Sequence, residues 1–358
     1  MITTPKQDGF WMPGEHSPQQ SVWLAWPTRL DNWREQAVPA QQVFTHFIKQ
    51  LQTQVQVKVA VLPELVKQVT ELLPQDVEVH AIAYNDAWMR DIGPTMVINQ
   101  AGEMRAINWQ FNAWGGELDG LYHDWQDDQL VASEVAKREQ VQQYDAPFIL
   151  EGGSIHCDGE GTLYTTEECL LHPSRNPHLS KAQVEENLRE YLGVEKVIWL
   201  PKGLYNDETN GHIDNLLHLV RPGEVMLTVC EDADDPQYDI SMIALDILQN
   251  ARDAQGRKIK VYILPMPGPL YMSEMEARGL VQPDRMVREA GERLGASYAN
   301  FLICNQAIFY PLLDTQQDAK AEKVFAQAFP DHKLIGIPGR EVVLGGGNLH
   351  CITQQIPA

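Results

Sequence analysis

One pattern of polar and hydrophobic positions recurs five times along the chain. Each copy opens with a polar or glycine-containing cluster and continues into a strand-like apolar run. The best copies add a glycine turn and a second strand-like run. The copies begin at Arg90, Glu151, Asn210, Ser297 and Gly345. Self-similar segments of this length are typical of repetitive architectures, so this pattern governs the expected fold.

Helical and extended segments are predicted between the copies. Ser180 and Gln183 have the spacing of a capping box and open an apolar-periodic run that stops at Gly193, which predicts a helix. Similar apolar spacing predicts further helices over residues 41–51, 239–251 and 318–329. Short extended runs follow several of these helices, at residues 55–62, 196–200, 258–264 and 333–337.

Each unit is therefore predicted to run strand, strand, helix, strand. The first three copies are 60 and 61 residues apart, counted at Asp91, Glu151 and His212. Five such units closed into a ring predict an α/β fold, a five-bladed α/β propeller of ββαβ repeats around a central pit. Because no interdomain linker is visible, we expect residues 1–358 to form a single domain.

A closed ring would place the head of every unit, meaning the residues directly before its first strand, near one axis. Asp91, Glu151, His212 with Asp214, and Cys351 occupy this position. Turn chemistry alone also puts polar residues ahead of strands. Four of five heads carry an ionisable or nucleophilic group, however, so we expect these side chains to form one site.

Residues 344–351, Leu-Gly-Gly-Gly-Asn-Leu-His-Cys, carry a distinctive signal for a nucleophile. Three consecutive glycines permit backbone conformations that side chains forbid and let the chain pass close to a ligand. A free cysteine is more often a small buried hydrophobe. A thiol on a short segment directly behind a glycine turn is an unusual choice for core packing, so Cys351 is the candidate nucleophile.

The other heads offer partners for that thiol. His212 lies two residues before Asp214 on a predicted strand, which would direct both side chains to one face. We expect His212 to act as acid and base, with Glu151 holding the imidazole. Asp91 and Asp214 would accept the N–H fork of a planar guanidinium. Trp88 would stack on the cation, or serve as a core tryptophan.

Composition narrows the range of functions. The chain is 44% hydrophobic and 22% charged, and its net charge is −21. This acidity disfavours nucleic acid and anionic lipid and favours small cations, although solubility alone also accounts for it. No apolar run approaches the ~20 residues of a membrane span, and no secretory signal opens the chain. Five scattered cysteines without CxxC pairs indicate reduced thiols in a cytoplasmic compartment.

The sequence lacks the motifs of several other kinds of binding or catalytic site. The sequence has no GxxxxGK[ST] and no GxGxxG after a strand, so nucleotide binding is unsupported. It also has no HExxH, no paired Cys and His spacing for zinc, and no GxSxG. A papain-like cysteine hydrolase is harder to exclude, but its cysteine would normally cap a helix.

Four segments, in this order, closely resemble the agmatine deiminases. They are Trp-Met-Arg-Asp-Ile-Gly-Pro at 88–94, Glu-Gly-Gly-Ser at 151–154, Glu-Thr-Asn-Gly-His-Ile-Asp-Asn at 208–215 and Gly-Gly-Gly-Asn-Leu-His-Cys at 345–351. This family belongs to the guanidine-modifying superfamily of five-bladed α/β propellers. The resemblance extends from about Gly14 to the last residues.

The resemblance implies a reaction and a role for each matching residue. Agmatine would be hydrolysed to N-carbamoylputrescine and ammonia, a step in polyamine metabolism. Cys351 would be the nucleophile that forms an amidino-thioether, His212 the acid and base, and Glu151 its partner. Asp91 and Asp214 would grip the guanidinium. The resemblance further implies that no metal or organic cofactor is needed, and that the chain forms a homodimer.

The substrate remains the more open question. By the resemblance, Glu208 would meet the far ammonium of agmatine, and the acidic balance of the chain favours such a dication over arginine. Bacterial-type peptidylarginine deiminases share the same motifs and are the first alternative. The second is a non-catalytic protein that binds a polyamine or guanidino compound, which would keep the carboxylates but have no use for the thiol.

Overall fold

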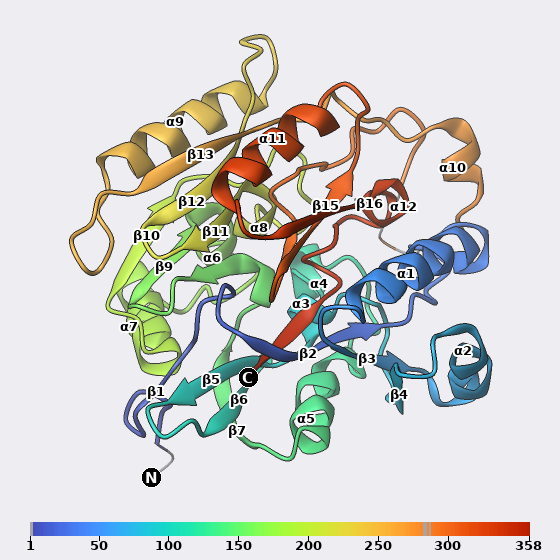
Figure 1. Ribbon diagram of the computed structural model, residues 1–358, viewed down its shortest axis with the longest axis horizontal. Coiled ribbons are helices and arrows are strands. Elements are labelled where there is room, and N and C mark those ends of the chain that lie inside the picture. The colour runs from blue at the N-terminus through green and yellow to red at the C-terminus, as the bar shows by residue number, and fades with distance from the viewer. Residues whose placement is uncertain (1–2, 282–284, 286–287) are drawn as a thin grey trace.

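The computed structural model describes residues 3–281, 285 and 288–358. Across these residues the strands form five sheets arranged around a common centre (Figure 1). The long helices lie on the outside of this ring, and the C-terminal strand runs close to its middle. This arrangement confirms the predicted α/β class and the placement of the units around one axis.

Four of the sheets share one connection. A first strand pairs antiparallel with a second, a helix follows, and a third strand returns parallel to the second. This confirms the predicted ββαβ unit. The elements are β5 (Thr95–Asn99), β6 (Met104–Gln110), α5 (Asp128–Arg138) and β7 (Gln142–Ile149); β8 (Ile155–Cys157), β9 (Thr162–Thr166), α7 (Lys181–Leu192) and β10 (Lys196–Leu200); β11 (Leu217–Arg221), β12 (Glu224–Val229), α9 (Gln237–Asn250) and β13 (Lys260–Pro265); β14 (Leu302–Cys304), β15 (Ala307–Leu312), α11 (Asp318–Ala328) and β16 (Lys333–Pro338).

The fifth sheet joins the two ends of the chain. Strand β17 (Gln354–Pro357) pairs antiparallel with β2 (Gln19–Ala25), so that Gln354 lies opposite Trp23. Helix α1 (Val38–Leu51) follows, and β3 (Gln56–Val61) and β4 (Glu78–Ala81) extend the sheet in parallel. The fifth unit therefore takes its first strand from the end of the sequence and the rest from its beginning, which closes the ring through hydrogen bonds.

Helix α7 shows how local sequence sets an element. Ser180 accepts a hydrogen bond from the Gln183 amide, and the Gln183 side chain completes the capping box. The helix ends at Gly193, whose φ of 67° favours glycine. Val184, Leu188 and Leu192 lie on its buried face. The predicted start, face and end of this helix are confirmed.

The remaining elements are short. They are β1 (Phe10–Trp11), which pairs with β5, and the helices η1 (Glu35–Ala37), η2 (Pro63–Leu65), α2 (Val66–Leu72), α3 (Met89–Ile92), α4 (Gly116–Asp119), η3 (Gly152–Ser154), α6 (Glu167–Leu170), α8 (Ile213–Leu216), α10 (Glu274–Arg278) and α12 (Arg340–Leu344). Three of these one-turn helices, α3, η3 and α8, stand ahead of the first strands β5, β8 and β11.

One sequence prediction about these elements is wrong. His212 and Asp214 do not lie on a strand: His212 caps the N-terminus of α8, and Asp214 lies within that helix. The Asp207 carboxylate accepts a hydrogen bond from the His212 amide at 2.9 Å, which stabilises the start of the turn. Strand alternation is therefore not what brings the two side chains together.

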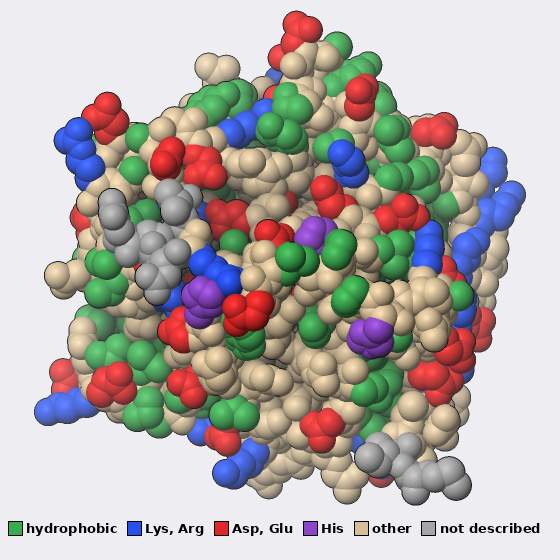
Figure 2. Space-filling view, turned by 180° about the vertical axis from the view of Figure 1, so that it is seen from behind, with side chains coloured by type: hydrophobic (Ala, Val, Ile, Leu, Met, Phe, Trp, Pro, Cys, Tyr) green, Lys and Arg blue, Asp and Glu red, His purple; other side chains and the backbone are tan. Residues whose placement is uncertain are grey.

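The largest hydrophobic cluster connects the closing sheet with the centre of the ring. It contains buried residues of β2, α1 and β3, and it also includes Trp88, Cys351 and Ile356. Figure 2 shows acidic side chains spread over one face of the molecule among hydrophobic and neutral ones. None of the described helices has both the length and the apolar character that a membrane span requires.

Candidate active site

The ring brings the heads of all five units together at its centre. Each head lies directly before the first strand of one sheet, so residues distant in sequence become neighbours. In order along the chain, the heads supply Asp91, Glu151, His212 with Asp214, Asn300, and Cys351.

Gly153 lies where three of these side chains meet. A Cβ atom placed on Gly153 would be 2.6 Å from His212 Nδ1, 2.9 Å from Asp214 Oδ2 and 3.0 Å from Asp91 Oδ1. The Gly153 amide donates a hydrogen bond to Asp91 Oδ1 at 2.8 Å. Because glycine has no side chain, the two aspartates and the imidazole can pack this closely against the Gly153 backbone.

His212 is buried between two carboxylates. Its Nδ1 is 3.9 Å from Asp91 Oδ2, and its Nε2 is 3.7 Å from Glu151 Oε2. Burial lowers the pKa of His212, but Asp91, the Cys169 thiol and Glu151 outweigh this and hold the pKa well above its usual value. The imidazole therefore rests in its protonated form.

Glu151 is itself held by a buried arginine. Arg175 Nε donates to Glu151 Oε1 at 2.7 Å, while Glu151 Oε2 faces His212. Burial raises the pKa of Glu151, but Arg175 and His212 lower it by more. Glu151 is thus an ionised carboxylate beside the imidazole. The role that the sequence predicts for it, holding His212, stays a prediction.

Cys351 contacts two of the other heads. Asn300 Nδ2 donates a hydrogen bond to Cys351 Sγ at 2.9 Å, and Sγ lies 3.5 Å from Asp214 Oδ2. Asn300 Oδ1 also accepts from the amides of His350 and Cys351, at 2.9 and 3.2 Å. Asn300 was missed by the sequence analysis. Its place at the head of the fourth unit is the signal that would have found it.

The thiol of Cys351 lies in an environment that opposes its ionisation. Burial raises the pKa of Cys351 well above its ordinary value, and the charges of Asp214 and Asp91 raise it further. Hydrogen bonds from the Asn348 backbone and the Asn300 side chain act in the opposite direction but are weaker. Without a bound ligand, the sulfur is therefore protonated.

Each glycine of the 345–347 turn allows a different neighbour to approach. A Cβ atom on Gly345 would lie 2.7 Å from Trp33, and one on Gly346 would lie 2.8 Å from Glu208 Oε2. On Gly347 it would lie 2.6 Å from the Trp88 ring and 3.0 Å from Cys351 Sγ. The turn thus borders both the sulfur and the two residues expected to receive the rest of the substrate.

Trp88 and Glu208 already have protein partners. The Trp88 ring stacks on Trp33 with centroids 5.2 Å apart, and its Nε1 donates to Asp86 Oδ2 at 2.9 Å. Both oxygens of Glu208 accept from Arg288, at 2.6 and 2.8 Å. One face of the indole is therefore covered, and an incoming ammonium would share Glu208 with a guanidinium.

Two groups of described residues have the donor atoms that a metal ion could use. They are Glu15, His156, His218 and His350, and Glu151, Cys169 and His212. In each group the carboxylate is already paired with an arginine: Glu15 with Arg90 at 3.2 Å and Glu151 with Arg175 at 2.7 Å. A cation would lie beside a fixed positive charge, so neither group suits one well.

The chain was compared with known families and structures. The sequence model of the Porphyromonas-type peptidyl-arginine deiminase family matches residues 11–357. The chain belongs to this family. The match extends over all five sheets and all five heads of the ring. It confirms the family resemblance predicted from the sequence.

Several members of this family are similar to the chain over nearly their full length. A Vibrio parahaemolyticus protein named "Putative agmatine deiminase" is 56% identical over 358 residues, covering 100% of this chain and 99% of the relative. The agmatine deiminase of Enterococcus faecalis has a TM-score of 0.95 at 44% identity, covering 99% and 98%. A C. jejuni agmatine deiminase with a cysteine-to-serine change and bound substrate has a TM-score of 0.83 at 29% identity, covering 97% and 96%.

Proposed function

We propose that this chain is an agmatine deiminase, which hydrolyses agmatine to N-carbamoylputrescine and ammonia. The observation that carries the proposal is the convergence of Asp91, Asp214 and His212 on Gly153, with Asp214 also in contact with Cys351 Sγ. Paired carboxylates suit a planar guanidinium, and the sulfur suits attack on its carbon. The agmatine deiminases among its relatives support the same reaction.

The two aspartates have the hydrogen-bonding capacity to hold the guanidinium. Among the described residues, Asp214 Oδ1 has no hydrogen-bond partner although it is buried. Asp91 accepts one bond on each oxygen, from the Gly153 amide and from Trp114 Nε1. Each carboxylate oxygen can accept two bonds, so Asp91 retains an acceptor position on each. Guanidinium N–H groups bound there would hold the central carbon near Cys351.

The reaction then follows in two halves. The Cys351 thiol loses its proton to solvent as the substrate binds, and the thiolate attacks the guanidinium carbon. His212 then donates its proton to one amino group of the adduct, which departs as ammonia and leaves an amidino-thioether on the sulfur. His212, now neutral, takes a proton from water, and the resulting hydroxide attacks the same carbon. Collapse of that adduct breaks the carbon–sulfur bond and releases the carbamoyl product. The proton of the added hydroxyl passes to the departing sulfur, which restores the Cys351 thiol.

The charges around the sulfur explain how the thiolate forms only when substrate is present. The bound guanidinium and the His212 imidazolium place positive charge beside two aspartates that otherwise oppose ionisation of Cys351. We propose that substrate binding lowers the pKa of the thiol, so that binding and activation of the nucleophile are one event. A thiol kept protonated between turnovers is also a poor target for oxidation.

The identity of the substrate rests on Glu208. Its carboxylate is paired with Arg288 beside Gly346, next to the glycine that borders Cys351. The ammonium of agmatine would bind Glu208, whereas a free α-carboxylate would bind Arg288 and compete with Glu208 for it. The family description makes a peptidyl-arginine deiminase the second candidate, since its substrate carries neither charge at that position.

The test measures ammonia release from agmatine, free arginine and an arginyl peptide. Agmatine should be turned over with the highest kcat/KM. Rapid turnover of the peptide with none of agmatine would overturn the choice of substrate. Mass spectrometry of enzyme quenched during turnover should find an amidino adduct on the peptide that contains Cys351, which would identify the nucleophile.

The variant Cys351→Ser separates catalysis from binding. Its oxygen is a far poorer nucleophile, so it should release no ammonia but still bind agmatine in calorimetry. The matched control is Cys304→Ser, which alters a buried thiol on β14 outside the centre and should leave turnover intact per folded enzyme. Ammonia release by Cys351→Ser at the wild-type rate would contradict the assignment, and binding without any wild-type turnover would favour the non-catalytic alternative.

The wider role follows from the same reaction. N-carbamoylputrescine is a precursor of putrescine, so we place the chain in polyamine synthesis. The resemblance supports a homodimer, and five free cysteines support a reducing compartment such as the cytoplasm. Sedimentation at several concentrations would test the dimer, because a single species with the mass of one chain would exclude it.

A further inference from the structure

A second group of ionisable residues lies next to the site and has no part in the mechanism above. Glu15, His156, His218 and His350 are all buried, with their nitrogen and oxygen atoms close to one another. His350 immediately precedes Cys351 in the chain. The group therefore lies against both the nucleophile and the aspartate beside it.

His350 bridges two carboxylates. Its Nδ1 is 2.8 Å from Asp214 Oδ2, and its Nε2 is 2.7 Å from Glu15 Oε1. A neutral imidazole has a hydrogen on only one nitrogen, whereas an imidazolium donates from both. Two ionised carboxylates at these distances are each satisfied only if His350 is protonated, and this gives two charge-assisted hydrogen bonds in a row.

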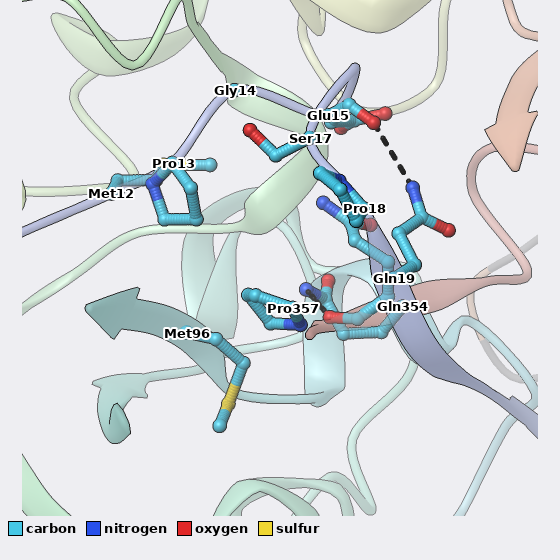
Figure 3. Close-up of a pocket in the computed structure, with 11 residues that line it drawn as sticks. Met12, Pro13, Gly14, Glu15, Ser17, Pro18, Gln19, Met96, Gln354 and Pro357 are labelled. Atoms are coloured by element: carbon cyan, nitrogen blue, oxygen red, sulfur yellow. Dashed lines mark hydrogen bonds between the residues drawn. The ribbon is translucent and has the colours of Figure 1, made fainter. Parts of the chain in front are cut away.

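Glu15 is fixed by several contacts besides the one with His350. Arg90 Nη1 donates to Glu15 Oε1 at 3.2 Å, and Gln19 Nε2 donates to the Glu15 main-chain carbonyl at 3.0 Å (Figure 3). Gln19 Nε2 also donates to the Ile303 carbonyl at 2.9 Å. Figure 3 shows that Glu15 comes from the segment that leads into β2, so the chain start is tied to the centre of the ring.

The charges facing His350 come from every element packed around it. Asp214 and Glu15 favour the imidazolium, while burial and Arg90 oppose it, and the balance raises the pKa of His350. His156 and His218 lie on β8 and β11 with ring centroids 5.0 Å from His350. Burial lowers the pKa of both, so they stay neutral and His350 carries the positive charge.

The consequence appears at Asp214. One of its oxygens, Oδ2, accepts from His350 and lies against Cys351 Sγ, whereas Oδ1 has no partner among the described residues. Rotation of the carboxylate would exchange these roles. A donor fixed on Oδ2 therefore determines which oxygen is left for a guanidinium and in which direction it points.

We propose that His350, held between Asp214 and Glu15, is a positioning residue that keeps the Asp214 carboxylate ionised and oriented for the substrate guanidinium. Glu15 acts through His350 and completes the chain Glu15–His350–Asp214. This inference rests on the proposed function, because it assigns guanidinium binding to Asp214. It adds two residues, one near the start of the sequence, to the machinery of the site.

A divalent cation does not fit the same four residues. His350 Nε2 and Glu15 Oε1 are 2.7 Å apart, the distance of a direct hydrogen bond, and two ligands of one zinc ion at about 2.0 Å each and tetrahedral angles would be wider apart. The Arg90 guanidinium occupies the same oxygen of Glu15. Protonation of His350 accounts for these contacts without a metal ion.

The test is the variant Glu15→Gln, which retains the shape of the side chain and removes its charge. Without Glu15, His350 should lose its proton at lower pH, and the hold on Asp214 should weaken. We expect KM for agmatine to rise by about tenfold with a smaller change in kcat, since hydrogen bonds to charged groups contribute on this scale. The alkaline limb of the kcat/KM profile should also move toward neutral pH.

The matched control is Asp253→Asn. Asp253 is a buried carboxylate that pairs with Arg257 in the connection between α9 and β13, outside the centre of the ring. Its variant should lose stability and leave KM and the pH profile unchanged. A Glu15→Gln profile that superimposes on the wild-type profile, with the same KM, would overturn the positioning role. So would an equal change in Asp253→Asn.

A measurement on the wild-type enzyme guards against a variant that does not fold. Neutron diffraction from deuterium-exchanged crystals should show deuterium on both ring nitrogens of His350 near neutral pH. Deuterium on only one nitrogen would overturn the proposal. If the wild-type enzyme releases no ammonia from agmatine, the proposed function itself fails, and this outcome is distinct from a failure of the His350 assignment.

Discussion

The acid limit of activity should be set by Asp91. Burial raises the pKa of Asp91 to about 6, His212 lowers it, and the charges of Asp214 and Glu151 raise it. Only the ionised form can hold a guanidinium. We therefore predict that kcat/KM for agmatine falls as pH drops through about 6, by roughly tenfold per unit once Asp91 is mostly protonated.

The free energy of unfolding should depend on the protonation of Asp91 in the opposite direction from the activity: it should rise as pH falls. The pKa of Asp91 is higher in the folded than in the unfolded chain, so the folded state binds the proton more tightly. Its contribution to the free energy of unfolding therefore increases as pH falls from about 6 toward the unfolded value near 4. Thermal unfolding measured alongside the kinetics would separate the two effects. A flat kcat/KM between pH 7 and 5 would contradict the prediction.

The thiol of Cys351 should ionise only in alkaline solution when no ligand is bound. Burial and the two aspartates raise its pKa, and the pKa values of the other four cysteines are raised as well. The thiolate absorbance must therefore be taken as the difference between the wild type and Cys351→Ser. We predict a step above pH 9, since the ordinary pKa of a thiol is ~8.5. A step well below neutral pH would show that the enzyme is activated before substrate binds.

At the scale of elements, η3 positions the site because its glycine lets three side chains pack against the backbone. Gly153 lies in this short helix, and the variant Gly153→Ala would place a methyl group 2.6 Å from His212 Nδ1. The imidazole and the aspartates would have to shift. We predict a loss of kcat/KM of about 10²-fold, the order expected for a displacement of 1 Å, with a smaller effect on stability.

The control for Gly153→Ala is Gly268→Ala. The nearest atom to a Cβ at Gly268 is Asp314 Oδ2 at 3.2 Å, and its backbone does not require a positive φ. This variant should retain activity. Equal kinetic constants for Gly153→Ala and the wild type would mean that close packing against Gly153 does not position His212 and the aspartates.

Elements of different length differ in how well the sequence predicts them. Helix α7 has a capping box, a periodic apolar face and a terminal glycine, and these local signals give both of its ends. Helix α8 has only one turn, which is too short to show a 3.6-residue period. For this reason His212 and Asp214 were assigned to a strand, although their convergence with Asp91 was predicted.

At the scale of the whole molecule, the site depends on the closing sheet. Ile356 of β17 is fully buried in the cluster that also contains Cys351. Ile356→Ala would leave a cavity in this seam, and we predict a loss of about 2–4 kcal/mol of unfolding free energy. Activity should fall in parallel at temperatures where the ring begins to open. Denaturant unfolding followed with kinetics would measure both.

The same substitution on another strand provides the comparison. Ile263 of β13 is 44% exposed, so Ile263→Ala should cost less than Ile356→Ala, because nearly half of the residue is already exposed to solvent. Similar losses for the two variants would show that closure between β17 and β2 adds no particular stability to the ring.

Much of the molecule followed from the sequence alone. The five repeats, the order of strands and helices within a unit, and the candidate residues at four heads were all readable, because periodicity, capping and glycine turns are local properties. The motifs around Asp91, Glu151, His212 and Cys351 also identified the family. Asn300 occupies the same position in the fourth unit, and this position was the one signal for it, because an amide suggests no reaction until the sulfur is seen beside it.

Only the tertiary structure decided how distant segments meet. The pairing of β17 with β2 joins residues from opposite ends of the chain, and no local pattern specifies such a partner. The same closure brings Glu15 to His350, and it puts His350 against Asp214. Hydrogen bonds and buried charges of this kind depend on position in space, so they form only once the ring has closed and water has been excluded from its centre.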